Sequence, residues 1–533
     1  MRRILVLQLS RMGDILMTGP LLRGLRREHP SAEISLMVMD SFSTTPLPPR
    51  LYDHLVSFPL ENLARLLADQ SADWAPALAH LREFVDGLGS VPFDFVLNLS
   101  HTDTSGLIAS LIPAKRHVGF TLRANRSGAI DGGWMTYVRA AARSRELMSF
   151  HLVDLFSWAG GVGRDDAGLE VDITPADHQW AERFLVTRGL EGRPLIAMML
   201  GASTEAKRWP AERFAELANA LAPHLGEIIL VGGSGEQALS STFLARATRR
   251  VFDCTGAASL GELAALLHRS RLLVTNDTGP MHVAVAAGTR VVDISSGPVS
   301  AYETGPYGPE HVVVEPELAC YPCPVGSECN HFACRSALSA QDAAAVVLFA
   351  LGERPAPVVT NARVLQGRRC SPSGRIEFVP ATGGATLNDL IRVATGRVWE
   401  RTLDTPVRVA GDCVSADADV ALAGASDPVR LAAIQTALAE VVRESQAAAK
   451  EVGTLTRVSP VKQRAISLSV QGRFERLLAL GEVERAVHAL VTFLRYEIGS
   501  IDASDLAVVA RLQAAAYEAT SVRGKLLAEG LAG

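Results

Sequence analysis

The chain has 533 residues, of which 48% are hydrophobic and 20% are charged, so it can bury sizeable cores and should fold. Its length exceeds one ordinary core, and domain-size statistics suggest roughly three units. The formal net charge of −5 argues against a protein that binds nucleic acid through bulk positive charge. Apolar runs stay below the roughly 18 residues that a membrane-spanning helix needs.

The N-terminal stretch MRRILVLQLSRMGD begins like a signal peptide, but Arg11 and Asp14 end its apolar run early. A first β-strand explains this pattern better. The seven cysteines are an odd number in a long chain, which does not suggest a secreted disulfide scaffold. We therefore expect a cytoplasmic protein.

The first third of the chain alternates strand and helix patterns. We expect strands at 3–9, 32–39 and 93–100, and helices at 15–30 and 104–112. The middle third repeats this rhythm, with strands at 194–200, 227–233, 271–276 and 290–295 and helices at 209–225, 259–270 and 280–288. Apolar runs on both strand faces, separated by amphipathic helices, indicate parallel sheets covered on both sides. The sequence therefore predicts two doubly wound α/β domains that face a cleft, with a hinge near residues 175–190.

The composition changes after Gly352. Residues 352–384 are rich in Pro, Gly and Arg and are typical of a linker with short strands. Ala- and Leu-rich amphipathic segments follow, roughly at 387–397, 429–451, 471–497 and 503–529. We therefore predict three units, which are Rossmann-like domains at 1–180 and 181–352 and a linker plus helical extension at 353–533.

Two polar residues follow predicted strands. Asp14, in LSRMGDILMTGP, lies where the first strand passes into the first helix, and ligands of open α/β sheets bind beyond the carboxyl ends of strands. It is either a catalytic group or the N-cap of that helix. Lys207 lies in the loop before WPAERF, where a cation suits a phosphate, and the alternative is a solvated surface lysine.

The segment VTNDTGPMH indicates an anion-binding turn. Gly279 lets the backbone approach a ligand, and Pro280 begins a helix whose free N–H groups and dipole favour an anion such as a diphosphate. Thr278 can add a hydroxyl donor. Asp277 would repel phosphate unless it accepts N–H groups of the turn or a sugar hydroxyl. His282 either points at a phosphate or packs against its neighbours.

Glu236 lies in VGGSGE, which lacks the third glycine of the dinucleotide fingerprint and indicates a tight turn after a strand. Its carboxylate either takes a ribose hydroxyl or is a plain surface group.

Four cysteines form the pattern C-x₂-C-x₅-C-x₄-C, and they are Cys320, Cys323, Cys329 and Cys334. Thiols at this spacing predict a structural zinc or iron site, since four thiolates leave no open position for catalysis, and uncomplexed thiols are the alternative. Asp417 and Asp419 form a DxD pattern, which marks metal-dependent sugar-nucleotide transferases of another class. It lies in an Ala-rich stretch and is interpreted as chance.

Four stretches together resemble glycosyltransferase family 9, the ADP-heptose:lipopolysaccharide heptosyltransferases. They are ILVLQLSRMGDILMTGPLLRGLRREHP, KRWPAERFAELANAL, VTNDTGPMHVAVAAGT with TGPYGP after it, and CYPCPVGSECNHFAC. The resemblance covers about residues 1–352. It implies the GT-B architecture, in which the N-terminal domain binds the acceptor and the C-terminal domain binds the sugar nucleotide.

The resemblance also implies residue roles. The general base of the family falls on Asp14. Its donor-binding residues fall, in chain order, on Lys207, Glu236, Ser259, Asp277, Thr278, Gly279, Pro280 and His282. Within that set, Lys207 contacts phosphate and Glu236 contacts ribose. The segment near Ser259 contacts the base, and the turn that begins at Asp277 binds the diphosphate.

The implied activity is inverting transfer of a heptose from ADP-heptose to a hydroxyl of a cell-surface glycan, such as the lipopolysaccharide core, with no catalytic metal or other cofactor. Two alternatives stay open, which are a sugar-nucleotide 2-epimerase on the same architecture and a non-catalytic member that binds a nucleotide sugar or a partner. A lipid-linked acceptor implies peripheral contact with the cytoplasmic face of the inner membrane. For the helical extension we expect a homo-oligomer or docking to a partner.

Overall fold

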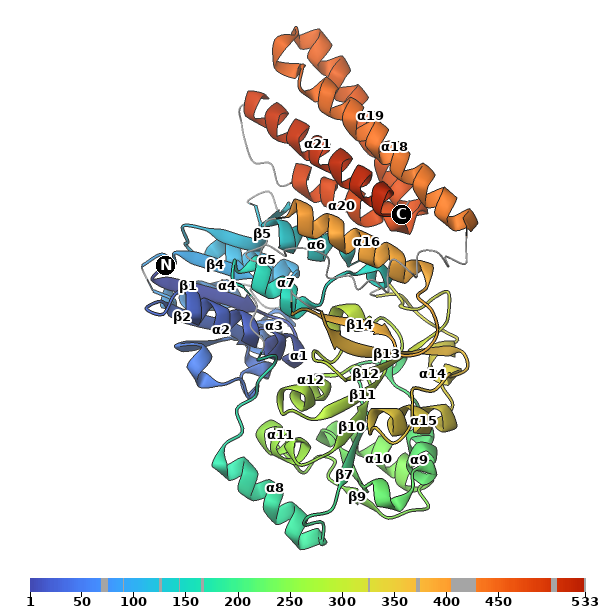
Figure 1. Cartoon of the computed structure of the whole chain (residues 1–533). Helices are drawn as coiled ribbons and strands as arrows, with labels where there is room; N and C mark the ends of the chain where they lie inside the picture. The colour runs from blue at the N-terminus through green and yellow to red at the C-terminus, as the bar shows by residue number, and fades with distance from the viewer. Residues whose placement is uncertain are drawn as a thin grey trace.

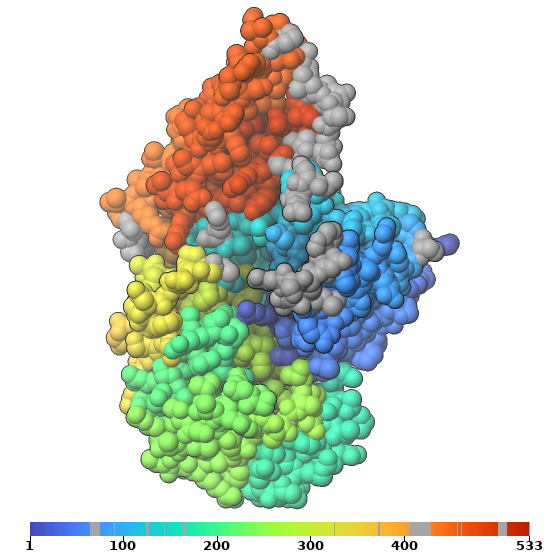
Figure 2. Space-filling view, turned by 180° about the vertical axis from the view of Figure 1, so that it is seen from behind, coloured from blue at the N-terminus to red at the C-terminus, as the bar shows by residue number. Residues whose placement is uncertain are grey.

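The computed structural model describes residues 1–68, 75–89, 91–123, 127–142, 144–163, 167–324, 326–370, 374–403, 428–499 and 506–531. Asp417 and Asp419 therefore lie outside the described residues. Two sheets lie in separate halves of the molecule, and a stack of long helices lies against the N-terminal half, at the top of Figure 1. Seen from behind, the same three parts are in contact (Figure 2). The predicted fold class is confirmed.

The N-terminal half contains a six-stranded sheet in the order β3-β2-β1-β4-β5-β6. The strands are β1 (Arg3–Gln8), β2 (Glu33–Met39), β3 (His54–Phe58), β4 (Phe95–Asn98), β5 (His117–Leu122) and β6 (Gly128–Asp131). All neighbouring strands are parallel except β5 and β6. The order reverses between β1 and β4, so the ends of these strands form the topological switch point of the sheet, where ligands bind in such folds.

Helices cover both faces of this sheet because the side chains of β1 alternate between two apolar clusters. Ile4 and Val6 pack in one cluster with α2, α6 and α7, whereas Leu5 and Leu7 pack in the other with α3, α4 and α5. The helices of this half are α1 (Met12–Met17), α2 (Gly19–Glu28), α3 (Leu60–Ala68), α4 (Ala75–Gly87), α5 (Asp103–Leu111), α6 (Gly133–Ala141) and α7 (Leu152–Ala159).

The helix predicted at 15–30 is two helices in the structure. The first begins earlier, at Met12, and the two meet at Thr18. Pro20 lies in the first turn of the second helix, where its missing N–H interrupts the hydrogen-bond ladder that one continuous helix would need.

The C-terminal half contains an eight-stranded sheet in the order β14-β13-β12-β11-β10-β7-β8-β9. The strands are β7 (Leu195–Met199), β8 (Glu227–Val231), β9 (Val251–Asp253), β10 (Leu272–Thr275), β11 (Arg290–Ile294), β12 (Val312–Pro316), β13 (Ala362–Arg369) and β14 (Ile376–Pro380). Strands β7 to β12 are parallel, and their order reverses between β7 and β10, which defines a second switch point. The helices of this half are α8 (Pro175–Arg188), α9 (Ala211–Ala220), α10 (Gln237–Leu244), α11 (Leu260–His268), α12 (Gly279–Ala286), α13 (Ala301–Thr304), α14 (Ala333–Ala337) and α15 (Ala340–Ala350).

The segment predicted as a linker with short strands supplies β13 and β14, which extend the second sheet in antiparallel register. The domain boundaries at 180 and 352 stay predictions, but a cut at 352 would remove two strands from this sheet. The range 175–190, predicted as a hinge, holds the regular helix α8, which packs on α11. The chain changes halves just before it, because the backbone N–H of Asp172 still bonds the carbonyl of Pro46 at 2.8 Å.

The helical extension consists of α16 (Leu387–Thr402), α18 (Pro428–Val452), α19 (Pro460–Val483), α20 (Arg485–Gly499) and α21 (Leu506–Gly530). The segment predicted as one helix at 471–497 is parts of two helices that meet at Glu484. Helix α16 lies along the N-terminal half, where the fully buried Trp399 contacts Tyr137 of α6 and Phe493 of α20, with ring centroids 5.4 and 4.7 Å away. Trp399 therefore joins the extension to the N-terminal half. Within the described ranges, no helix is long and apolar enough to cross a membrane.

Replacing Trp399 with alanine should lower the free energy of unfolding by about 3–5 kcal/mol, because the variant leaves a cavity between α6, α16 and α20. Urea unfolding followed by circular dichroism measures this loss. Val429→Ala, at a helix position that is 80% exposed, is the control and should leave the unfolding midpoint nearly unchanged. Equal midpoints for the two variants would contradict the assignment of Trp399 as a shared core residue.

Candidate active site

The switch points of the two sheets meet where the first turns of α1 and α12 touch. A Cβ atom added to Gly13 would lie 2.5 Å from the ring of His282, and one added to Gly279 would lie 2.4 Å from the side chain of Met12. The His282 ring leaves no room for a side chain at Gly13, whereas a side chain at Gly279 would require the terminal methyl of Met12 to move. Gly13 and Gly279 thus lie where the two halves meet, and we call this contact between α1 and α12 the seam. Asp14 and the turn that begins at Asp277 lie at the same seam.

Asp14 is the third residue of α1, whose N-cap is Arg11, so the N-cap alternative is wrong. Its Oδ2 accepts a hydrogen bond from the backbone N–H of Arg11 at 3.1 Å. Burial raises the pKa of Asp14 to about 6, and the nearby carboxylates of Glu303 and Asp277 add to the rise, while the N–H and guanidinium of Arg11 oppose it. The site thus holds a carboxylate that is a stronger base than an ordinary aspartate.

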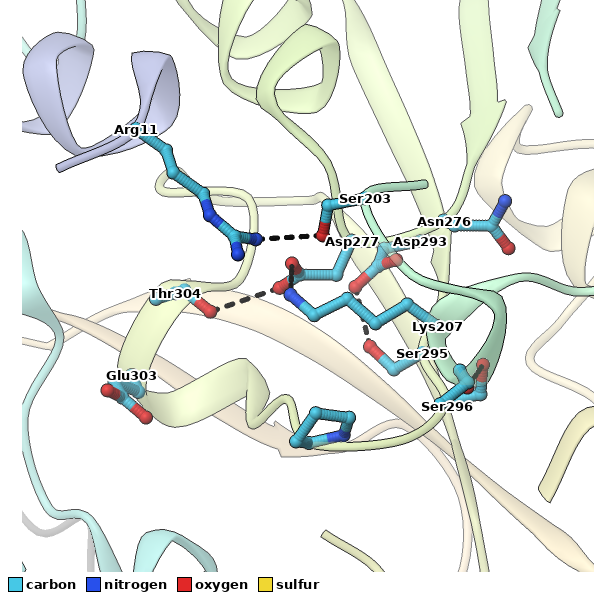
Figure 3. A network of polar contacts seen from close by, with 12 residues as sticks. Arg11, Ser203, Lys207, Asn276, Asp277, Asp293, Ser295, Ser296, Glu303 and Thr304 are labelled. Atoms are coloured by element: carbon cyan, nitrogen blue, oxygen red, sulfur yellow. Dashed lines mark hydrogen bonds and ion pairs between the residues drawn. The ribbon is translucent and has the colours of Figure 1, made fainter. Parts of the chain in front are cut away.

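Lys207 and Asp277 form a largely buried ion pair, with 2.9 Å between Nζ and Oδ1 (Figure 3). The hydroxyl of Thr304 donates to the other carboxylate oxygen of Asp277 at 3.0 Å. Burial acts to raise the pKa of Asp277, but Lys207, His282 and Thr304 outweigh it and hold this pKa below its usual value. The surface-lysine alternative for Lys207 is therefore wrong.

Asn276 holds the loops after β7 and β10 together. Its buried side chain accepts a hydrogen bond from the N–H of Trp209 at 2.8 Å and donates to the carbonyls of Leu200 and Gly201 at 3.0 and 3.2 Å. Sequence reasoning missed this residue, although a polar side chain directly after an apolar strand was a usable signal.

The other residues of the predicted turn start helix α12. Thr278 is its N-cap, and its side chain makes no capping hydrogen bond, while Pro280 is the second helical residue. His282 is buried, and burial lowers its pKa to about 4, so the ring is neutral at physiological pH. Its Nδ1 has no hydrogen-bond partner among the described residues. The N–H groups at the start of α12 and the hydroxyl of Thr278 are suited to an anion.

Glu236 lies across the ends of β7 and β8. Its carboxylate occupies the space where a Cβ atom on Gly201 or Gly232 would stand, and Oε2 accepts from the N–H of Gly233 at 2.8 Å. Burial raises the pKa of Glu236, so it is not a plain surface group. Ser259 is instead the N-cap of α11, where its hydroxyl accepts from the N–H of Glu262 at 3.3 Å. No contact joins Ser259 to the other predicted site residues in the described part of the chain.

Two side chains of the N-terminal half reach across the seam, and sequence reasoning missed both. The guanidinium of Arg11 donates to the hydroxyl of Ser203 at 2.8 Å (Figure 3). Arg145 forms an ion pair with Glu303 of α13 and also donates to the carbonyl of Pro298. Both contacts join the two halves.

The four cysteines predicted to hold a metal lie near one another, but the structure gives the metal itself no support. Cys320, Cys323, Cys329 and Cys334 are free thiols. Across the residues that the structure describes, no group of three or more His, Cys, Asp or Glu side chains is arranged to hold a metal ion. Burial raises the pKa of Cys323 and Cys334, and the neighbouring thiols raise both further, which favours the protonated form. The predicted structural zinc or iron is therefore unsupported.

Comparison with known proteins agrees with this architecture. Residues 81–331 match the family model of glycosyltransferase family 9 (heptosyltransferase). The chain is 23% identical over 304 residues to the lipopolysaccharide core heptosyltransferase OpsX of Haemophilus influenzae, covering 55% of this chain and 78% of the relative. It is 25% identical over 343 residues to lipopolysaccharide heptosyltransferase 1 of Pseudomonas aeruginosa, covering 60% and 86%.

The fold has a solved counterpart in the crystal structure of the glycosyl transferase family 9 from Veillonella parvula. The TM-score is 0.52 and the identity 22%, over 66% of this chain and 98% of that one. Two facing doubly wound domains of this kind make up the GT-B architecture. Over residues 81–331 the chain is similar to glycosyltransferase family 9, and it is a glycosyltransferase enzyme. The helical extension lies beyond residues 81–331, which the family model matches.

Asp14→Asn should stabilise the protein at pH 8 by about 1–3 kcal/mol, because a carboxyl with a pKa of about 6 in the folded state and 3.8 in the unfolded state is costly to bury ionised. The folded state binds the proton more tightly, so this cost is fully present above pH about 6 and shrinks as the pH falls toward 4. Urea unfolding at both ends of this range measures it. Asp86→Asn, at an exposed position of α4, is the control. The same gain at pH 4 and pH 8 would contradict the explanation.

Proposed function

We propose that the enzyme is an inverting heptosyltransferase that transfers a heptose from ADP-heptose to a hydroxyl of the lipopolysaccharide core. The observation that carries the proposal is the position of Asp14, a carboxylate of raised pKa that lies close enough to the carboxylate of Asp277 for the two charges to interact, where α1 meets the N-terminus of α12. Asp277 in turn pairs with Lys207. A base on one side and an anion site on the other are the two groups that such a transfer needs. The names and sequences of the family relatives support the heptose and the acceptor class.

The C-terminal half binds the sugar nucleotide in this proposal. The diphosphate lies at the N-terminus of α12, where the N–H groups near Gly279 and the hydroxyl of Thr278 donate to it. Lys207 turns from Asp277 toward the phosphate oxygens. Glu236, beside the end of β8, accepts from a ribose hydroxyl, and the segment near Ser259 lies along the adenine.

The N-terminal half binds the acceptor. Asp14, as carboxylate, takes the proton from the acceptor hydroxyl while that oxygen attacks the anomeric carbon. Attack comes from the face opposite the diphosphate, so the bond to the leaving phosphate oxygen breaks with inversion. Lys207 and the α12 N-terminus stabilise the negative charge that grows on the ADP. In this mechanism, Lys207 and the N-terminus of α12 supply the positive charge that stabilises the leaving diphosphate.

Removing the lysine charge should weaken ADP binding by at least about tenfold, because a charge-assisted contact to the diphosphate is worth about 1.5–3 kcal/mol. Calorimetry against ADP, UDP and GDP measures this and identifies the nucleotide. A single Lys207→Met change would leave Asp277 unpaired and buried, so the informative variant is the double change Lys207→Met with Asp277→Asn, which keeps the pair neutral.

The matched control for this experiment is Arg213→Met, which removes one exposed positive charge from α9 and should bind ADP as the wild type does. Preference for UDP or GDP would overturn the proposed donor. Wild-type protein that binds none of the three would favour the non-catalytic alternative.

Asp14→Asn should lower kcat by roughly 10²–10⁴-fold while ADP still binds, because the variant removes the base and leaves the donor site intact. In the wild type, kcat/KM should fall tenfold per pH unit below the pKa of about 6, since only the carboxylate form accepts the proton. Transfer assays from pH 4.5 to 8 measure this acid limb. A flat profile through pH 6 would remove Asp14 from the role of base.

A further inference from the structure

A polar chain of three residues connects the helical extension to the N-terminal half. Helix α20 packs against α6 and β6, and the hydroxyl of Tyr496 on α20 accepts a hydrogen bond from Nε of Arg139 on α6 at 3.1 Å. The same guanidinium donates through Nη1 to the main-chain carbonyl of His101 at 3.2 Å. Its carbon lies 5.8 Å from the ring centroid of Phe120, which holds the guanidinium from a further side.

His101 lies in the turn between β4 and α5, at the switch point of the first sheet. This turn touches the segment that leads to Asp14, since the N–H of Leu9 donates to the hydroxyl of Ser100 at 2.8 Å. The hydroxyls of Ser10 and Ser100 are 3.3 Å apart. A ligand bound beyond the carboxyl ends of β1 and β4 would therefore lie against this turn and near the base at once.

The ends of the turn are held by its own residues. Asn98 donates to the carbonyl of Phe120 at 2.7 Å and accepts from the N–H of Ser100 at 3.0 Å, and Thr102 caps α5. Between these points, the carbonyl of His101 is held by Arg139. The turn therefore depends on α6 in its middle, and through α6 on Tyr496.

The ring of His101 has an unmet polar requirement. Both ring nitrogens are buried, and neither has a hydrogen-bond partner among the described residues. Burial lowers the pKa of this ring to about 4, with the charge of Arg139 adding to the effect, so the imidazole is neutral at physiological pH. A neutral imidazole offers one donor and one acceptor, which matches a sugar hydroxyl.

We propose that the helical extension is a working part of the acceptor half, in which Tyr496 and Arg139 are positioning residues that hold the β4–α5 turn, and with it His101, against the glycan acceptor. This inference rests on the proposed function. It gives the extension a role in acceptor recognition within one chain, beyond the oligomer or partner docking that the sequence predicted for it.

The test uses the full-length chain with Tyr496→Phe, which removes the hydroxyl that accepts from Arg139. Tyr517→Phe is the matched control, because it makes the same change at another buried tyrosine of the extension, on α21. The acceptor probe is the deacylated lipopolysaccharide core of a heptose-deficient strain, with ADP-heptose as donor. Hydrogen–deuterium exchange of residues 99–106 is measured on the same proteins.

We expect Tyr496→Phe to raise the acceptor KM by about three- to tenfold, the worth of one hydrogen bond, with the donor KM unchanged. Exchange at 99–106 should become faster than in the control. Arg139→Lys, which keeps the charge but cannot bridge both partners, should show the same split between acceptor and donor KM.

Unchanged exchange at 99–106 in Tyr496→Phe would overturn the link, and an acceptor KM equal to that of Tyr517→Phe would overturn its role in recognition. Equal rises in the donor KM and the acceptor KM would indicate general loosening of the fold and would also overturn the proposed role in acceptor recognition. Failure of the proposed function is distinguishable, because in that case the wild type would neither bind ADP nor turn over.

Discussion

The ion pair between Lys207 and Asp277 is the interaction on which the rest of the site depends. It joins the loop after β7 to the turn after β10, across the switch point of the second sheet. An unpaired charge in such a place would cost several kcal/mol, so the pair lets the seam close while no anion is present. A diphosphate would compete with Asp277 for the same ammonium, and Thr304 would still donate to the carboxylate. In the proposed mechanism, this exchange of partners lets Asp277 stand beside the bound diphosphate.

Much of the fold could be predicted because its cause is local. Apolar runs long enough for a strand, each followed by an amphipathic helix, leave few arrangements other than covered parallel sheets. Asp14, Lys207 and the turn at Asp277 could be singled out as candidates for the same reason, since each lies between the end of a buried strand and the first turn of the α-helix that follows it. The structure brings these three together where the first turns of α1 and α12 meet, and Gly13 leaves room there for the ring of His282.

What sequence reasoning missed is the set of contacts between distant segments. The Arg11–Ser203 contact spans 192 residues and the Arg145–Glu303 contact spans 158, and no local pattern marks either partner. Ser259 has a structural role that sequence reasoning also missed, because its side chain closes a capping box with Glu262 that the spacing of the two residues already indicated.

The route of the chain between its two halves limits how the seam can open. The chain crosses once between α7 and α8 and returns between β14 and α16, which then lies along the N-terminal half. The two connecting segments are short, and a line drawn through them is an axis about which the halves can rotate while both segments keep their length. Sliding one half past the other would stretch at least one of the two segments. Opening then has essentially a single degree of freedom. Both substrates would then enter, and both products leave, by one path. The substrate that binds nearer to the mouth of that path would have to bind second.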